Sequence, residues 1–89
     1  MKLNITIEIW RKGDTYLATA PELDFISQGR TFEEAKKNLL EVVEIQFEEM
    51  TEMGTLDEYL LERGFITDGN SIFPQKEIVG FEKSVVTMN

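Results

Sequence analysis

The sequence contains no cysteine and no histidine. Without cysteine the chain can form neither a disulfide nor a thiolate metal ligand, and a small fold without such cross-links suits the reducing cytosol. Without histidine it lacks the commonest general base and the commonest metal ligand. Thiol chemistry and imidazole-based catalysis are therefore excluded, and an enzymatic function would have to rest on carboxylates.

Long apolar runs are also absent. The first residues, MKLNITIEIW, alternate between apolar and polar side chains, unlike a signal peptide, and no later stretch approaches the roughly 20 apolar residues of a membrane-spanning helix. We therefore expect a cytoplasmic protein with no membrane association. Its 89 residues predict a single domain, residues 1–89. A domain this small has a thin core, so we also expect a homo-oligomer, either a dimer or a larger assembly.

Positive charge is scarce. Nine Lys and Arg residues stand against 17 Asp and Glu residues, which gives a formal net charge of −8 and a pI of about 4.4. Phosphate backbones repel such a chain, so direct binding of nucleic acid is not expected. A basic protein partner fits better, because opposite potentials speed and orient encounter. The alternative is that the net charge only keeps a small protein soluble.

Three strands are predicted in the first third of the chain. Apolar residues alternate with polar ones over residues 3–10, the pattern of a half-buried strand. Turn-forming residues at 12–14 separate it from a second strand at 15–20, so the two form a hairpin. A short third strand is predicted at residues 25–28.

A long helix follows. Thr31 and Glu34 form a T-x-x-E capping box, which predicts a helix that begins at residue 32. Apolar residues then recur every three or four positions, and Gly54 is expected to end the helix in a left-handed conformation.

The rest of the chain predicts a second helix and a final strand. Thr55 and Glu58 form another capping box, and the short helix that they begin is expected to end at Gly64. Residues 67–71 are loop-like, and alternation at residues 82–88 predicts a last strand. The order β-β-β-α-α-β describes an α+β domain in which a long helix packs on a three-stranded antiparallel sheet.

One block of the sequence, from Tyr16 to Glu44, couples a strand end, a turn and a capped helix at a distinctive spacing. P-E-L is followed by a glycine, a threonine, E-E-A and an asparagine. This pattern resembles the central block of the HicB-like antitoxin family, in a short form that lacks the family's C-terminal DNA-binding domain. The matching positions are Tyr16, Ala18, Pro21, Glu22, Leu23, Gly29, Thr31, Glu33, Glu34, Ala35, Asn38 and Glu41.

The resemblance implies a partial ribonuclease-H-like fold. It also implies an antitoxin that binds and masks a small basic ribonuclease toxin of the HicA type. The matching residues are expected to be structural, and the amide of Asn38 is expected to hydrogen-bond the strand or turn near Gly29. The competing hypothesis is a solitary, oligomeric structural or regulatory module of the same fold that has no toxin partner.

An acidic ridge on the long helix is the candidate partner-binding surface. Glu41, Glu44, Glu48 and Glu52 recur at a spacing of three or four, so they share one side of the helix. Like charges at this spacing cost about 0.2–0.5 kcal/mol per pair in an isolated helix, and the Lys or Arg groups of a partner would reverse that cost. The alternative is a solvated outer face.

Apolar residues in peripheral positions are candidates for an oligomer interface. Trp10 shares a strand face with polar residues, and Leu60, Leu61 and Phe65 are numerous for so short a segment. The alternative is that the leucines and Phe65 pack locally.

A metal-dependent nuclease is the third hypothesis. Such an enzyme needs several converging carboxylates that hold divalent cations, and Glu8, Asp14, Glu22 and Asp24 are the candidates. Solvated surface charge is the better account of these residues, so we expect no enzyme, no metal and no cofactor.

Overall fold

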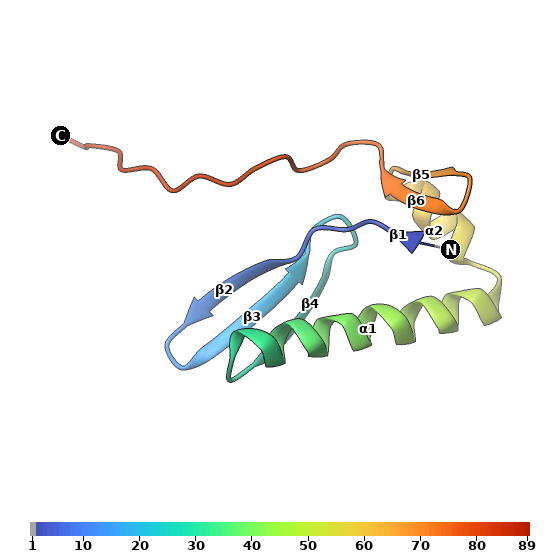
Figure 1. Ribbon diagram of the computed structural model, residues 1–89, viewed down its shortest axis with the longest axis horizontal. Helices are drawn as coiled ribbons and strands as arrows, with labels where there is room; N and C mark the ends of the chain where they lie inside the picture. The colour runs from blue at the N-terminus through green and yellow to red at the C-terminus, as the bar shows by residue number, and fades with distance from the viewer. Residues whose placement is uncertain (1) are drawn as a thin grey trace.

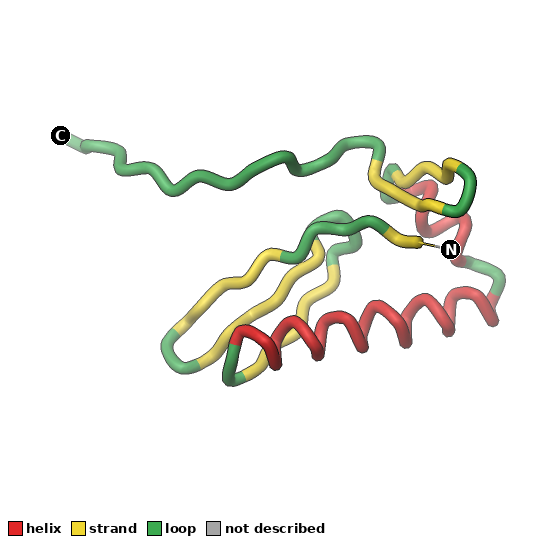
Figure 2. The backbone as a smooth tube through the Cα atoms, in the orientation of Figure 1, coloured by secondary structure: helices red, strands yellow, loops and turns green. Residues whose placement is uncertain are grey.

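Eight elements follow one another in this computed structural model, which describes residues 2–89 (Figures 1 and 2). They are β1 (Lys2–Leu3), β2 (Glu8–Lys12), β3 (Thr15–Ala20), β4 (Phe25–Gly29), α1 (Phe32–Met53), α2 (Leu56–Glu62), β5 (Phe65–Asp68) and β6 (Ser71–Pro74). The α+β class, with a three-stranded antiparallel sheet, a long helix, a short helix and strands toward the C-terminus, is confirmed. No helix of the described part of the chain has both the length and the apolar character needed to cross a membrane.

The first sheet has the order β2-β3-β4, with both pairs antiparallel. Ala18 lies opposite Ile9 on one side and Ser27 on the other, and it is fully buried. Its neighbour Leu17 lies opposite Trp10 on the other face of the sheet, because side chains alternate along a strand. Helix α1 covers only the face that carries Ala18 (Figure 1).

Both ends of α1 are formed by the residues that the sequence indicates. The Thr31 hydroxyl accepts a hydrogen bond from the Glu34 N–H at 3.0 Å, and the Glu34 carboxylate accepts one from the Arg30 N–H at 3.2 Å. Gly54 ends the helix with φ of 72°, and its N–H donates to the Met50 and Thr51 carbonyls. A left-handed residue is least strained when it is glycine, which explains why this residue type ends the helix.

The start of α1 lies directly against β4. A Cβ on Gly29 would lie 2.6 Å from the backbone nitrogen of Ala35, so no larger residue fits without moving the helix. The Asn38 amide donates to the Gln28 carbonyl at 2.8 Å, which confirms the hydrogen bond expected near Gly29. The glycine, alanine and asparagine of the family-like block therefore serve a close approach of helix and sheet.

A second sheet has the order β1-β6-β5. Strand β1 pairs parallel to β6, with Leu3 beside Ile72, while β5 and β6 form an antiparallel hairpin. Tyr59 of α2 joins this half to the first sheet: its hydroxyl donates to the Leu23 carbonyl at 2.6 Å, and its ring stacks on Phe25 at a centroid distance of 6.1 Å.

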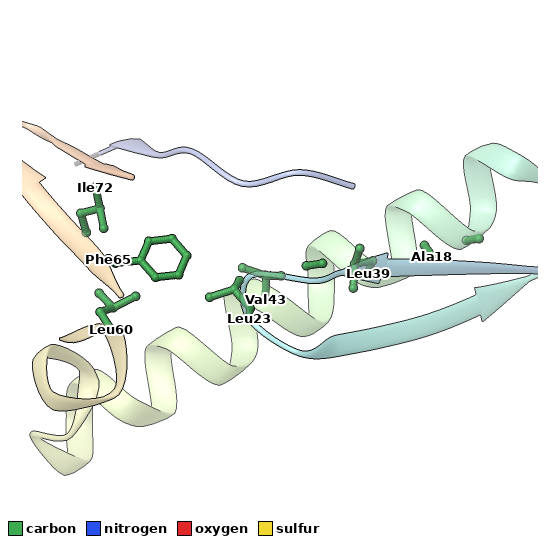
Figure 3. Close-up of a cluster of buried hydrophobic side chains, with 9 residues drawn as sticks. Ala18, Leu23, Leu39, Val43, Leu60, Phe65 and Ile72 are labelled. Atoms are coloured by element: carbon green, nitrogen blue, oxygen red, sulfur yellow. The ribbon is translucent and has the colours of Figure 1, made fainter. Parts of the chain in front are cut away.

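One hydrophobic cluster runs through both halves (Figure 3). Ala18 and Leu39 lie at the end under the first sheet, Leu60 and Phe65 lie at the end under the second, and Leu23 lies between them. The buried residues of the cluster are Ala18, Ala20, Leu23, Ala35, Leu39, Val43, Leu60, Phe65 and Ile72.

Three sequence-based expectations about secondary structure are wrong. The alternating stretch 3–10 is not one strand, because β1 pairs with β6 and β2 pairs with β3, with residues 4–7 between them in neither. Residues 67–71 belong to a hairpin whose turn uses Gly69 with φ of 60°. Residues 82–88 form no strand, because no neighbouring strand lies beside them.

The segment that follows β6 leaves the body of the molecule (Figure 1). The Gln75 N–H donates to the Gly64 carbonyl at 2.8 Å, and residues 77–89 then run extended in neither helix nor strand. We refer to residues 77–89 as the C-terminal arm. The Cα radius of gyration is 15.4 Å, whereas a compact chain of this length has about 12 Å. The extended arm accounts for this difference.

Candidate functional site

The acidic ridge lies on the exposed side of α1. All four glutamates are solvent-exposed, whereas Ala35, Leu39 and Val43 of the same helix are buried. The second half of α1 extends past the first sheet toward β1 and β6 (Figure 1).

A groove of about 490 Å³ lies along this seam. Its apolar lining comes from four elements, β1, α1, α2 and β6, and its rim carries three carboxylates. We refer to it as the acid-rimmed groove; it is lined by Leu3, Glu44, Phe47, Glu48, Thr51, Glu52, Leu56 and Ile72.

Three of the four ridge residues therefore come together at one site. Glu44, Glu48 and Glu52 line the acid-rimmed groove. Glu41 lies outside it, in a second hollow of about 320 Å³ that also contains Lys36, Lys37 and Glu44. Glu44 therefore borders both hollows, Glu48 and Glu52 line only the acid-rimmed groove, and Glu41 lines only the hollow that contains the two lysines.

The chemistry of the groove suits an apolar group accompanied by a cation. Leu3, Phe47 and Leu56 present apolar surface, and no Lys or Arg is among the lining residues. The Thr51 hydroxyl already donates to the Phe47 carbonyl at 2.7 Å, so the polar groups facing a ligand are mainly carboxylates. Carboxylates only accept hydrogen bonds when ionised, and Lys or Arg are their strongest donors.

The predicted oligomer residues divide into two pairs. Trp10 on the edge strand β2 and Leu61 on α2 are exposed, at 58% and 74%. Leu60 and Phe65 are instead buried in the core, so their side chains are not accessible to another subunit. Local packing explains this pair, because α2 needs an apolar side to cover β5.

The carboxylates considered for a metal site lie in separate places. Within residues 2–89 no three Asp or Glu side chains come close enough to hold a metal ion together. Glu22 has a structural contact, since its carboxylate accepts a hydrogen bond from the Thr6 N–H at 2.9 Å. Asp24 sits in the turn after β3 with φ of 60°.

The other residues of the family-like block have structural positions. Leu23 is fully buried, and Tyr16 is half-buried and packs against the core. Pro21 is exposed in the turn that ends β3, where its missing N–H costs no ladder hydrogen bond. The floor of the groove could not be predicted from the sequence, because the parallel pairing of β1 with β6 brings Leu3 beside Ile72, and Leu56 reaches the same place from α2.

Comparison of the chain with protein-family models, with curated proteins and with solved structures gave no match.

Proposed function

We propose that this protein is a HicB-like antitoxin, or a protein derived from one, that acts in the cytoplasm by binding and masking a small basic ribonuclease toxin of the HicA type. The observation that supports the proposal most strongly is the acid-rimmed groove, in which three carboxylates border an apolar floor. Such a site fits a protein segment that presents an apolar side chain next to Lys or Arg.

The negative charge of the protein favours a basic partner both at long range and at direct contact. The whole chain carries a formal net charge of −8, which attracts a basic protein and raises its association rate. At contact range, Glu44, Glu48 and Glu52 provide acceptors for charge-assisted hydrogen bonds. The first effect weakens with added salt, and the second depends on these particular side chains.

The apolar floor of the groove supplies binding free energy that exposed charges alone cannot. Ion pairs in full contact with water contribute only about 0–1 kcal/mol each. Interfaces gain most of their affinity from a few well-packed apolar or aromatic anchors that exclude water from the charges around them. Phe47 and Leu56 are positioned to receive such an anchor beside the glutamates.

The structural contacts of the family-like block are consistent with a scaffold of this kind. Gly29, Ala35 and Asn38 hold α1 against the sheet, so the exposed side of the helix is presented by a rigid layer. Preorganisation of this kind reduces the entropy lost on binding.

The second candidate function is an oligomeric structural or regulatory module of the same fold that has no toxin partner. The exposed apolar side chains of Trp10, Leu61 and the C-terminal arm favour it, because they provide surface for self-association.

Titration of the purified chain with a purified small basic ribonuclease toxin of the HicA type tests the proposal. Glu44→Lys with Glu48→Lys reverses two charges on the rim and is expected to weaken binding at least a hundredfold. Glu41→Lys is the matched control, because it lies on the same helix but outside the groove. Equal affinity of the double variant and the control would remove the groove from the interface.

A further inference from the structure

Strand β2 forms one outer edge of the first sheet, whose order is β2-β3-β4 (Figure 1). Lys12 and Thr15 flank a two-residue turn, so they form a hydrogen-bonded pair, and such pairs alternate with non-hydrogen-bonded ones along an antiparallel ladder. The N–H and C=O groups of Ile9 and Arg11 therefore point away from β3. Within residues 2–89 no backbone group outside the hairpin bonds to them. An edge of this kind can receive a further strand.

The side chains of β2 are complementary to a second copy of the same strand. Its sequence, E-I-W-R-K, places Glu8 and Lys12 at equal distances on either side of Trp10. All three share the face of the sheet that α1 leaves uncovered, because side chains alternate along a strand and Ile9 packs against the core. When two copies run antiparallel with Trp10 opposite Trp10, each Glu8 lies directly opposite Lys12 of the other copy. Opposite charges in such positions stabilise a strand pair.

The backbone of β2 selects the same register. The outward N–H and C=O groups of two strands meet when residues 9 and 11 oppose one another or themselves, which allows three antiparallel registers. Two of these, with Ile9 opposite Ile9 or with Arg11 opposite Arg11, overlap the strands over three residues, and the second also brings two guanidinium groups together. The register centred on Trp10 overlaps all five residues and is the one that joins Glu8 to Lys12.

This register also gives Trp10 a partner. Its side chain is 58% exposed on the open face of the sheet, beside Leu17 of β3. In the centred register the two Trp10 residues form a non-hydrogen-bonded pair, in which opposite side chains lie closest. Lys12 of the second copy lies on the diagonal, within reach of the indole ring for a cation–π contact. The exposed indole thereby gains contacts that a single copy does not provide.

The charge of this edge favours a second copy over the basic toxin. In the hairpin of β2 and β3, Glu8 and Asp14 are balanced by Arg11 and Lys12, whereas the whole chain has a formal charge of −8. A neutral hairpin offers a basic protein no net attraction. It is also a part of the surface through which two acidic chains approach each other with little local repulsion.

We propose that two copies of the chain join edge to edge through β2, in an antiparallel pair centred on Trp10. The two three-stranded sheets then form one sheet of six strands, and a two-fold axis at Trp10 makes both halves of the contact identical. No residue of β2 lines the acid-rimmed groove, so this contact is separate from the proposed toxin site.

Charge reversal in the full chain tests the register, with sedimentation equilibrium as the measurement. A five-residue strand pair buries little surface, so we expect a weak dimer with a dissociation constant on the order of 10–100 μM. Glu8→Lys puts lysine opposite lysine twice, Lys12→Glu puts glutamate opposite glutamate twice, and each is expected to raise the dissociation constant at least tenfold. A mixture of the two variants restores both Glu–Lys pairs, so it should associate as tightly as the native chain.

The matched control is Glu62→Lys, which makes the same change of net charge at an exposed position of α2, away from β2 (Figure 1). It should leave the dissociation constant of the dimer unchanged. A native chain that remains monomeric at millimolar concentration would overturn the proposal. So would a mixture of Glu8→Lys and Lys12→Glu that associates no more tightly than either variant alone.

Amide hydrogen exchange of the native chain distinguishes edge pairing from other contacts. The amides of Ile9 and Arg11 should gain protection as the protein concentration rises, while the Trp10 amide, which points to β3, should be protected at every concentration. Protection that does not depend on concentration would mean that the C-terminal arm of the same chain occupies the edge. No protection in the dimer would mean that the copies meet elsewhere, and either result refutes the proposal. Neither experiment involves a toxin, so its outcome is independent of the proposed antitoxin function.

Discussion

Residues 8–53 fold into one sheet and the helix that covers it, whereas residues 54–74 join β1 in a second, smaller sheet. Every side chain that is fully buried, at 0% exposure, belongs to the first group: Ala18, Ala20, Leu23, Ala35 and Leu39. The buried residues of the second group, Leu60, Phe65 and Ile72, all retain a few per cent of exposure. The first group therefore contains the most deeply buried part of the shared core, and the second group extends that core.

This difference explains where the candidate surfaces lie. The interior of the first half is fully used for packing, and its outer helix face supplies the glutamates of the acid-rimmed groove. The second half is formed by short elements that leave an edge, a groove and an extended arm uncovered. The candidate surfaces therefore lie where the packing of this small domain is least complete.

The largest loss of stability is expected from a substitution in the centre of the first half, residues 8–53. Leu39→Ala leaves a cavity at a fully buried position and should lower the free energy of unfolding by about 2–5 kcal/mol. The neighbouring Leu40 is 43% exposed, so Leu40→Ala should cost less than about 1 kcal/mol. Urea denaturation followed by circular dichroism measures both values. Similar losses in the two variants would contradict the assignment of the core.

A smaller loss of unfolding free energy is expected from a substitution where α1 contacts β4. Gly29→Ala places a Cβ 2.6 Å from the Ala35 nitrogen, and overpacking against backbone costs about 1–3 kcal/mol. Gly80→Ala is the matched control, because nothing lies within 4 Å of its Cβ position and it should leave stability unchanged. The same denaturation measurement applies. A neutral Gly29→Ala variant would show that the helix can move away from the sheet at little cost.

The joint between the halves is tested at Tyr59. Tyr59→Phe removes only the hydrogen bond to the Leu23 carbonyl and should cost about 0.5–1.5 kcal/mol. Tyr59→Leu also removes the stacking on Phe25 and the cation–π contact with Arg63, so it should cost more. Hydrogen exchange locates the effect: amides of β5 and β6 should lose protection before those of β3. Equal loss in both sheets would mean that the halves unfold as one unit.

The part of the fold that could be predicted from the sequence is the part set by local signals. The alternation in β3, the capping box at Thr31 and the stop at Gly54 each act within a few residues, and all three appear where expected. Alternation over residues 3–10 correctly indicates which side chains face the core. It does not reveal that the hydrogen-bond partner changes from β6 to β3 midway, because burial and strand pairing are separate properties.

The second half lacks such local signals. Its parallel pairing joins Leu3 to Ile72, which are far apart in the sequence and carry no local mark of their contact. For the same reason the ridge of glutamates could be predicted, since a helix places them on one side, whereas the apolar floor beside Glu44, Glu48 and Glu52 could not. Residues 82–88 have the alternation of a strand, but a strand needs a neighbour, and within the described chain they have none.

The smallest changes in stability are expected at the two T-x-x-E sequences, which share one sequence pattern but differ in structure. Thr31 has extended backbone angles, φ of −134° and ψ of 164°, and its hydroxyl caps α1. Thr55 has φ of −109° and ψ of −1°, and its side chain makes no capping hydrogen bond to α2. Thr31→Ala should therefore lower stability by about 1 kcal/mol, and Thr55→Ala by no more than a few tenths, with thermal denaturation as the measurement.

The reason lies in the residue before Thr55. Gly54 ends α1, and the Thr55 N–H donates to the Met50 carbonyl at 2.8 Å. The backbone of Thr55 therefore belongs to the C-terminal cap of α1. Its hydroxyl turns to the same carbonyl, at 3.5 Å, instead of reaching forward to α2. Thr31→Ser should retain most of the stability that Thr31→Ala loses, because serine caps equally well. If Thr55→Ala proved as costly as Thr31→Ala, the second box would form in solution, and the ends of the two helices would be less tightly coupled than these contacts indicate.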